Sequence, residues 1–247
     1  MKIQVYNSKK ETSKKAAQQA AEILKESINR KNKATFIAAT GLSQTDFLDD
    51  LSQDPKIDWS KTEMFHLDEY VGIPETHPAS FRKYLKERFI EKVNPGMVHL
   101  INGSSDKPDE EVARLNQLIA DKEIDVAFIG IGENGHVAFN DPPADFETKD
   151  PFIVVNLDQA CKKQQVGEGW FAGLEDVPSK AITMSVSQIM KSNDIICTVP
   201  GERKAEAVKK CFEGEISPNC PASILKKHEN AFIYLDQDSA QLLKNST

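Results

Sequence analysis

Short apolar runs alternate along the chain with longer polar segments in which apolar residues recur every three or four positions. The short runs, rich in β-branched residues, predict strands at 2–6, 34–40, 63–70, 97–101, 124–132, 151–157, 181–185, 194–199 and 231–236. The longer segments predict helices that include 12–30, 43–53, 79–92, 109–121 and 201–213. This alternation favours an α/β fold: an open, mainly parallel, doubly wound (Rossmann-like) sheet with helices on both faces.

Neither a repeat nor a low-complexity linker divides the 247 residues, so we expect a single domain over 1–247. In open parallel sheets, ligands bind beyond the carboxyl ends of the strands. Three segments that follow apolar runs are therefore the first candidates for a site: 40–46, 66–72 and 130–141.

The segment "GIGENG" at 130–135 has the GxGxxG spacing of a dinucleotide-binding loop and follows a predicted strand. Such a loop must open a helix, but Pro142, Pro143 and Pro151 fall within the next residues, and a proline inside a helix costs about 3 kcal/mol. We therefore expect no crossover helix here and no dinucleotide. The glycines instead allow a sharp turn and a close approach of the backbone to a ligand.

A histidine stands directly after these glycines, and a carboxylate follows it five residues later. The intervening turn can bring Asp141 back to His136, where it would hold the proton of one ring nitrogen and leave the other to exchange protons with a substrate. A hydrogen-bonded loop histidine without a function is the alternative. The surrounding glycines and the strand-end position favour the functional interpretation.

The apolar run at 63–70 ends with two adjacent carboxylates, Asp68 and Glu69. Neighbouring side chains point to opposite faces of a strand, so we expect one carboxylate in the site and the other in a structural role. A pair of solvated loop acids is the alternative. The histidine loop elsewhere in the chain favours the catalytic interpretation.

The stretch Thr40, Gly41, Leu42 and Ser43 joins a predicted strand to a predicted helix. Free backbone N–H groups at a helix N-terminus bind phosphate. Ser43 with Asp46 three residues later also forms a capping pair, and this stretch by itself favours capping over a ligand.

Another strand end, in "PGERKAEA", is followed by a helix with Arg203 and Lys204 in its first turns. Cations at that end oppose the helix dipole, so an anion bound there would explain them. Solvated surface charge is the alternative.

Composition narrows the class of protein. The net charge is −7 and the lysines are interspersed with acids, which argues against a nucleic-acid surface. The N-terminus has no apolar signal region, and no stretch approaches 18 consecutive apolar residues, so we expect a cytoplasmic protein without membrane insertion. The four scattered cysteines predict reduced thiols and no metal site.

Taken in order, five segments resemble the glucosamine-6-phosphate deaminase (isomerase) family, which shares its fold with 6-phosphogluconolactonases. They extend over nearly the whole chain: "ATGLS", "HLDEYVGIPETHPASF", "GIGENGHVAFNDP", "VPSKAITMSV" and "PGERKAEAV". The segments "LDEYVG" and "GHVAFNDP" point to the deaminase branch.

The resemblance implies a role for each matching residue. Asp68 matches the aspartate that moves a proton from C2 to C1 of the opened sugar, after which the C2 imine is hydrolysed and ammonia is released. His136 matches the histidine that opens the pyranose ring, Asp141 the acid that orients it, and Lys204 a phosphate-binding lysine. The segment 40–43 matches the phosphate loop.

Five positions depart from the family pattern. Two lie in the phosphate loop, where Leu42 and Gln44 replace the glycine or serine and the proline that are often found there. Asp141 stands where many members have glutamate, and Asn134, which we include with the catalytic group, stands where many have aspartate. In the lid expected at about 158–178, Gly169 occupies a place where these deaminases often have a phosphate-binding arginine. Arg203 is one cation that could bind the phosphate in place of that arginine.

The sequence thus predicts an isomerase and deaminase that converts a hexosamine 6-phosphate, with glucosamine 6-phosphate the leading case, to a ketohexose 6-phosphate and ammonia. A sugar-phosphate lactonase and a sugar-phosphate-binding protein without turnover are the alternatives. The neighbouring carbonyl acidifies C2, so we expect no metal and no organic cofactor. The resemblance also makes a homo-oligomer an expectation.

Overall fold

A seven-stranded parallel sheet forms the centre of the computed structural model, which describes residues 1–244. Its strand order is β1-β10-β9-β6-β2-β3-β5, and every neighbouring pair is parallel. These strands are β1 (Lys2–Tyr6), β2 (Ala34–Ala38), β3 (Thr62–His66), β5 (Met97–His99), β6 (Val126–Ile129), β9 (Asp194–Val199) and β10 (Ala231–Asp236). The predicted parallel sheet is confirmed.

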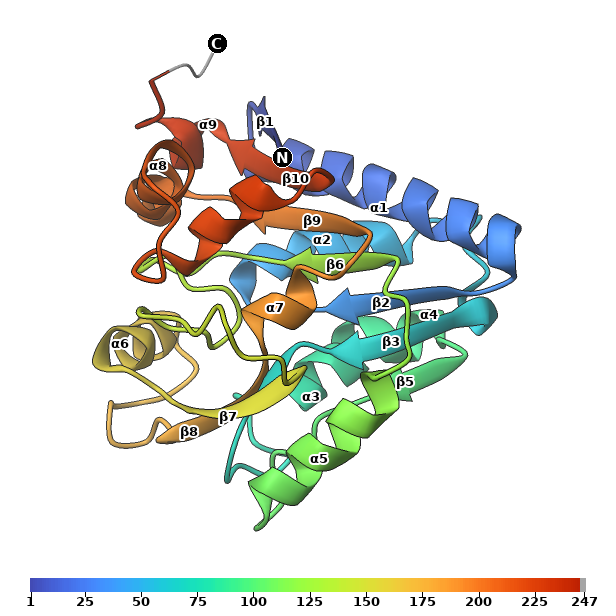
Figure 1. The fold of residues 1–247 in the computed structure, drawn as a ribbon. Coiled ribbons are helices and arrows are strands. Elements are labelled where there is room, and N and C mark those ends of the chain that lie inside the picture. The colour runs from blue at the N-terminus through green and yellow to red at the C-terminus, as the bar shows by residue number, and fades with distance from the viewer. Residues whose placement is uncertain (245–247) are drawn as a thin grey trace.

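Helices cover both faces of this sheet, as predicted (Figure 1). They are α1 (Lys9–Lys31), α2 (Leu42–Ser52), α3 (Phe81–Leu85), α4 (Glu91–Val93), α5 (Pro108–Ile119), α6 (Gln159–Gly167), α7 (Val186–Ile189), α8 (Ala205–Glu213) and α9 (Gln237–Ala240). The apolar core accordingly has two main parts. One contains buried residues of α1 and α2, and the other contains buried residues of α5, α7 and α8.

Shorter helical segments complete the chain. Three are 3₁₀ turns at Trp59–Lys61, Glu202–Lys204 and Pro221–Lys227, and one is a π turn at Lys86–Ile90 that connects α3 with α4. The 3₁₀ turn at Glu202–Lys204 leads into α8, so Arg203 and Lys204 precede the α-helix itself.

A second, antiparallel sheet differs from the expectation of one sheet. It has the order β4-β8-β7 and consists of β4 (Asp68–Tyr70), β8 (Lys180–Met184) and β7 (Phe152–Asn156). The predicted strand at 63–70 is in fact two strands, because the chain leaves the parallel sheet after His66. Leu67 connects the two sheets: its N–H donates to the carbonyl of Ala38 in β2, and its carbonyl accepts from the N–H of Met184 in β8.

The loop between β6 and β7 contains no helix over residues 136–151, which confirms the prediction drawn from its prolines. This part of the chain instead forms turns and an isolated bridge between Val137 and Asn140. The glycine-rich segment therefore does not begin a dinucleotide-binding crossover.

The prediction of four reduced cysteines is wrong for one pair. Cys211 of α8 and Cys220 form a disulfide, with their Cα atoms 5.7 Å apart, because the turn after α8 brings the chain back beside the helix. Cys161 and Cys197 are free and buried. Among the described residues, no helix combines the length and the apolar character needed to cross a membrane.

Candidate active site

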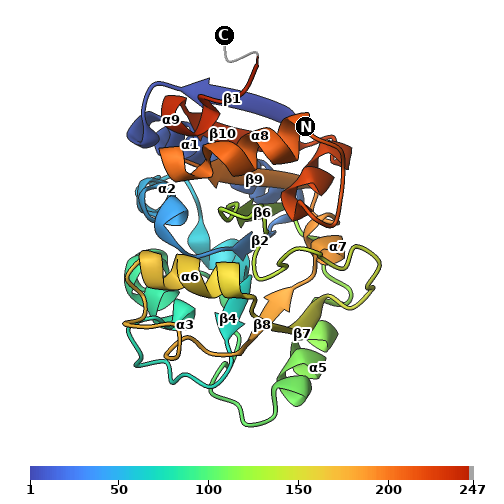
Figure 2. The ribbon, with the colours of Figure 1, turned by 90° about the vertical axis from the view of Figure 1, so that its left-hand side faces the viewer.

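A cavity of about 330 Å³ lies at the carboxyl ends of the parallel strands, as expected for this class of sheet. Figure 2 looks onto this edge and shows α2, α6 and α8 around it. Eight of the residues singled out from the sequence line the cavity: Thr40, Gly41, Leu42, Ser43, Asp68, His136, Arg203 and Lys204. The two others, Asn134 and Asp141, do not line it and instead contact His136. Segments distant in sequence thus meet in one site.

Asp68, the first residue of β4, presents a buried carboxyl group to this cavity. It is only 6% exposed, and burial together with the neighbouring charge of Glu69 raises its pKa to about 8. A carboxyl group with so high a pKa can both give and take a proton near neutral pH.

Glu69 has the structural role expected of the second carboxylate. It is fully buried and accepts hydrogen bonds from the backbone N–H groups of Phe81 and Arg82 and from the hydroxyl of Ser80. Nε of Arg82 lies 3.3 Å from its Oε2. These contacts fasten β4 to the start of α3 and so fix the backbone that carries Asp68.

His136, Asp141 and Asn134 form one network within the loop after β6. Nδ1 of His136 lies 3.1 Å from Oδ1 of Asp141, which confirms that the loop turns the carboxylate back to the ring. Asn134 braces both: its Nδ2 donates to Oδ1 of Asp141 at 3.1 Å, and its Oδ1 accepts from the backbone N–H of His136 at 3.0 Å. Burial would raise the pKa of Asp141, but the contacts with His136 and Asn134 outweigh it and lower this pKa.

Gly132 explains part of the glycine spacing. A Cβ atom at this position would lie 2.3 Å from atoms of the His136 ring, so any other residue would displace the imidazole. The glycine at this position therefore makes room for the histidine.

The phosphate loop expected at Thr40–Ser43 does form the N-terminus of α2, but not by the capping that the sequence favours. The N-cap is Gly41, with φ of +97°, and no side chain caps the helix; Ser43 is already inside its first turn. This helix end lines the cavity, and its backbone N–H groups can receive an anion. Gln44 is buried and donates to the hydroxyl of Thr198 at 2.7 Å, which holds this helix end against β9.

Lys204 and Arg203 border the same cavity but are held differently. Burial lowers the pKa of Lys204, so an anion beside it would relieve the cost of keeping its ammonium group charged. Arg203 is instead paired with Glu133, with 2.6 Å between Nη2 and Oε1, and is more than half exposed. Lys204 is therefore the better placed of the two for an anion.

Residues of the expected lid also line the cavity. They are Gln164 and Gln165 of α6 and, in the turn after it, Glu168 and Trp170. Gln165 accepts a hydrogen bond of 2.5 Å from the hydroxyl of Tyr70 in β4, which joins α6 to the strand that carries Asp68. Gly169 has φ of +81° and contributes no side chain.

Lys9, at the start of α1, is a cavity residue that sequence reasoning missed. It forms an ion pair of 3.1 Å with Asp46 of α2. Lys9 could have been predicted from the rule that ligands bind beyond the carboxyl ends of parallel strands, because α1 directly follows β1.

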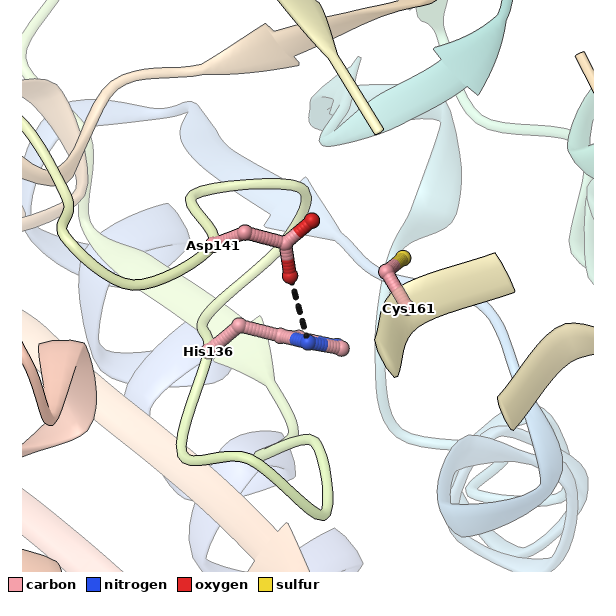
Figure 3. A group of neighbouring side chains, drawn as sticks. All are labelled: His136, Asp141 and Cys161. Carbon is pink, nitrogen blue, oxygen red and sulfur yellow. Dashed lines mark ion pairs between the residues drawn. The ribbon is translucent and has the colours of Figure 1, made fainter. Parts of the chain in front are cut away.

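Cys161 of α6 completes a group that the sequence did not predict. Ligand atoms of His136, Asp141 and Cys161 all lie within 4.8 Å of one another (Figure 3), whereas the absence of a metal site stays a prediction. Burial is the main reason that the pKa of Cys161 is raised, and the charge of Asp141 raises it further. Cys161 and His136 are 25 positions apart, so only the packing of α6 brings them together.

The fold and the cavity define this chain as an α/β protein with a ligand cavity at the carboxyl ends of a parallel sheet. It belongs to the family described as glucosamine-6-phosphate isomerases/6-phosphogluconolactonase, whose model matches residues 7–234.

Two relatives show the similarity in sequence. The chain is 34% identical over 236 residues to a glucosamine-6-phosphate deaminase of Exiguobacterium sibiricum, covering 95% of this chain and 92% of the relative. It is 35% identical over 231 residues to a glucosamine-6-phosphate deaminase of Staphylococcus saprophyticus, covering 91% and 93%.

Solved structures show the similarity in fold. The structure of a monomeric glucosamine-6-phosphate deaminase has a TM-score of 0.89 and 30% identity, covering 98% of this chain and 100% of that one. A 6-phosphogluconolactonase from Trypanosoma brucei has a TM-score of 0.81, with 98% of each chain covered, but only 17% identity, so it shows the shared fold alone.

Proposed function

We propose that this protein is an enzyme that isomerises and deaminates glucosamine 6-phosphate to fructose 6-phosphate and ammonia. The observation that carries the proposal is the placement of Asp68 and His136 on one cavity, together with the helix end at Thr40–Ser43 and with Lys204. The relatives named above, which carry the name of this deaminase, support the choice of substrate.

Substrate binding begins with the phosphate group. The N–H groups at the start of α2 and the ammonium group of Lys204 offer donors and positive charge on the same cavity. The sugar then extends toward Asp68 and His136. His136 gives a proton to the ring oxygen and the 1-hydroxyl group loses one, which opens the ring to the aldehyde.

Asp68 then acts on the opened sugar. Its carboxylate removes the proton from C2, which the C1 aldehyde acidifies, and returns a proton to C1. The C–N bond at C2 becomes an imine, water adds to that carbon, and ammonia leaves as the ketone forms. A carboxyl group whose pKa is raised to about 8 suits both halves of this transfer, because neither the acid nor the base form is strongly disfavoured near neutral pH.

The test is to incubate the purified protein with a panel of hexosamine 6-phosphates and to measure ammonia. We expect release from glucosamine 6-phosphate, and in deuterated water we expect deuterium at C1 of the product. Asp68→Asn should bind the substrate and release ammonia about 10²- to 10⁴-fold more slowly. If no member of the panel yields ammonia, or if this variant retains full activity, the proposal is wrong.

The same experiment distinguishes the alternatives. A lactonase would hydrolyse a sugar-phosphate lactone without releasing ammonia, and Asp68 would then have no proton to carry between carbons. A binding protein would give heat on titration with a sugar phosphate and no product. The cytoplasmic location, a lid movement of 158–178 and a homo-oligomer stay predictions.

A further inference from the structure

Three side chains of different chemistry converge behind the cavity: an imidazole, a carboxylate and a thiol. His136 and Asp141 come from the loop after β6, whereas Cys161 comes from α6 (Figure 3). Their ligand atoms lie within 4.8 Å of one another, with Nδ1 of His136 3.1 Å from Oδ1 of Asp141. The proposed reaction uses His136 and Asp141 and leaves the thiol without a role.

Two of the three residues are buried, and a ring nitrogen of one of them has no hydrogen-bond partner. His136 is 8% exposed and Cys161 is fully buried. Nδ1 of His136 is buried and has no well-aligned hydrogen bond, although Oδ1 of Asp141 is close to it. This nitrogen either carries a proton toward Asp141 or, once deprotonated, offers its lone pair to a metal ion, so the two states exclude each other.

The ligand set matches Zn²⁺ better than other common divalent ions. Zinc binds thiolate, imidazole and carboxylate together, whereas Mg²⁺ and Ca²⁺ prefer oxygen ligands. Ligand atoms of a tetrahedral zinc are roughly 3.3–3.8 Å apart, so small rotations of these side chains would complete the geometry.

We propose that His136, Asp141 and Cys161 form a binding site for Zn²⁺ that switches the enzyme off. Bound zinc would take the thiolate of Cys161, the carboxylate of Asp141 and one nitrogen of His136, and the thiol proton would be released to solvent. A fourth ligand, water or a substrate oxygen, would come from the cavity that His136 borders. His136 and Asp141 could then no longer act on the sugar ring, so zinc and turnover exclude each other. This inhibitory consequence rests on the proposed function, but the binding site itself does not.

Metal binding can be tested without any activity assay. The full-length protein, freed of metal by a chelator, is titrated with Co²⁺, which takes zinc ligands and absorbs near the ultraviolet when a thiolate binds it. We expect one equivalent of Co²⁺ to give this absorption and Zn²⁺ to remove it by displacement. Cys161→Ala should abolish the absorption, whereas Cys197→Ala, which removes the other free and buried cysteine, should preserve it.

Activity gives the second readout. We expect Zn²⁺ to inhibit ammonia release and a chelator to restore it. Cys161→Ala should retain basal turnover and need at least about tenfold more zinc for half inhibition. Cys161→Ser, checked by circular dichroism, serves if the alanine variant does not fold.

Each outcome decides a separate claim. The site is ruled out if the parent protein shows no cobalt–thiolate absorption, or if Cys161→Ala shows it undiminished. If cobalt binds through Cys161 but zinc does not inhibit ammonia release, the inhibitory role is wrong and the metal-binding site stands. Absence of ammonia release from every hexosamine 6-phosphate would refute the proposed function, and the cobalt titration would still decide the metal site.

Discussion

The imidazole of His136 and the carboxylate of Asp141 face each other across 3.1 Å, although they belong to one continuous loop. A carboxylate at this distance from Nδ1 favours the tautomer with the proton on that nitrogen and leaves Nε2 free to exchange a proton. Asp141 is thus a positioning residue, since it acts on the sugar through His136.

Replacing Asp141 by asparagine should therefore lower kcat by about 10- to 100-fold while KM changes little, because the tautomer and orientation of His136 are no longer fixed. Asp141→Glu should restore much of the rate, since the chain keeps a carboxylate. Steady-state ammonia assays measure both. Asp150→Asn, at an exposed position on the same loop, is the control. Equal loss in the asparagine and glutamate variants would contradict the assigned role.

The ionised form of Asp68, which the proposed reaction needs, should destabilise the folded protein. Its pKa in the folded protein is raised to about 8 from an ordinary value of 3.8. The neutral form of Asp68 therefore gives its full contribution to the free energy of unfolding below pH 4, and this contribution is lost as the pH rises toward 8. Asparagine stays neutral throughout. Asp68→Asn should thus raise the free energy of unfolding by about 1–3 kcal/mol at pH 8.5 and by little at pH 5.

The measurement is urea unfolding of both proteins at the two pH values. Ammonia release by the variant should fall by about 10²- to 10⁴-fold. A variant that is inactive but equally destabilised at pH 5 and pH 8.5 would indicate damaged packing and not the loss of a catalytic group.

The pH dependence of the rate provides a test without mutation. Because the ionised form of Asp68 removes the proton from C2, kcat/KM should rise about tenfold per pH unit below 8 and level off above it. The profile of kcat/KM reports the free enzyme, in which burial and Glu69 raise this pKa. A rate that stays constant between pH 6 and pH 8 would contradict the assignment of Asp68 as the base.

The sequence predicted the parallel sheet and the cavity edge because both follow from local patterns. Apolar runs that alternate with amphipathic segments require crossover connections, and such connections bring the loops after the strands to one edge. The prolines at 142, 143 and 151 correctly excluded a helix. Neighbouring side chains point to opposite faces of a strand, and this rule correctly predicted that only one of Asp68 and Glu69 lines the cavity.

What failed were features that depend on packing between distant segments. The second sheet arises because Leu67 pairs with both Ala38 and Met184, and nothing in the run at 63–70 marks that change of partner. The prediction that Ser43 caps α2 is wrong, because the N-cap is Gly41, with a positive φ, two residues earlier. Cys161 reaches the His136 loop only through the placement of α6.

Lys204 should control substrate affinity. Its ammonium group lies on the cavity, and a charge-assisted hydrogen bond to phosphate contributes about 1.5–3 kcal/mol, so Lys204→Met should raise KM by about 10- to 100-fold. Arg203→Met should have a smaller effect, because Glu133 already holds that guanidinium. Lys209→Met, an exposed position on α8, is the matched control for lost charge. The reverse ranking of Lys204 and Arg203 would show that Arg203 is the principal phosphate ligand.

Asn134 holds the network together as an amide, and a carboxylate in its place should make stability depend on pH. Nδ2 of Asn134 donates to Oδ1 of Asp141 at 3.1 Å, so Asn134→Asp would set two carboxylates against each other and raise the pKa of one of them. A raised pKa means stability that is lost as the pH rises. We expect this variant to lose about 1–2 kcal/mol of unfolding free energy at pH 8 and less at pH 5.

Asn134→Ala separates that charge effect from the loss of hydrogen bonds. It removes the contact with Asp141 and the acceptor for the backbone N–H of His136 without adding a charge. Its cost should therefore be similar at both pH values, about 1–2 kcal/mol. Urea unfolding of the three proteins at pH 5 and pH 8 measures the difference. If the aspartate variant shows no greater dependence on pH than the alanine variant, the side chain of residue 134 does not face Asp141 in solution.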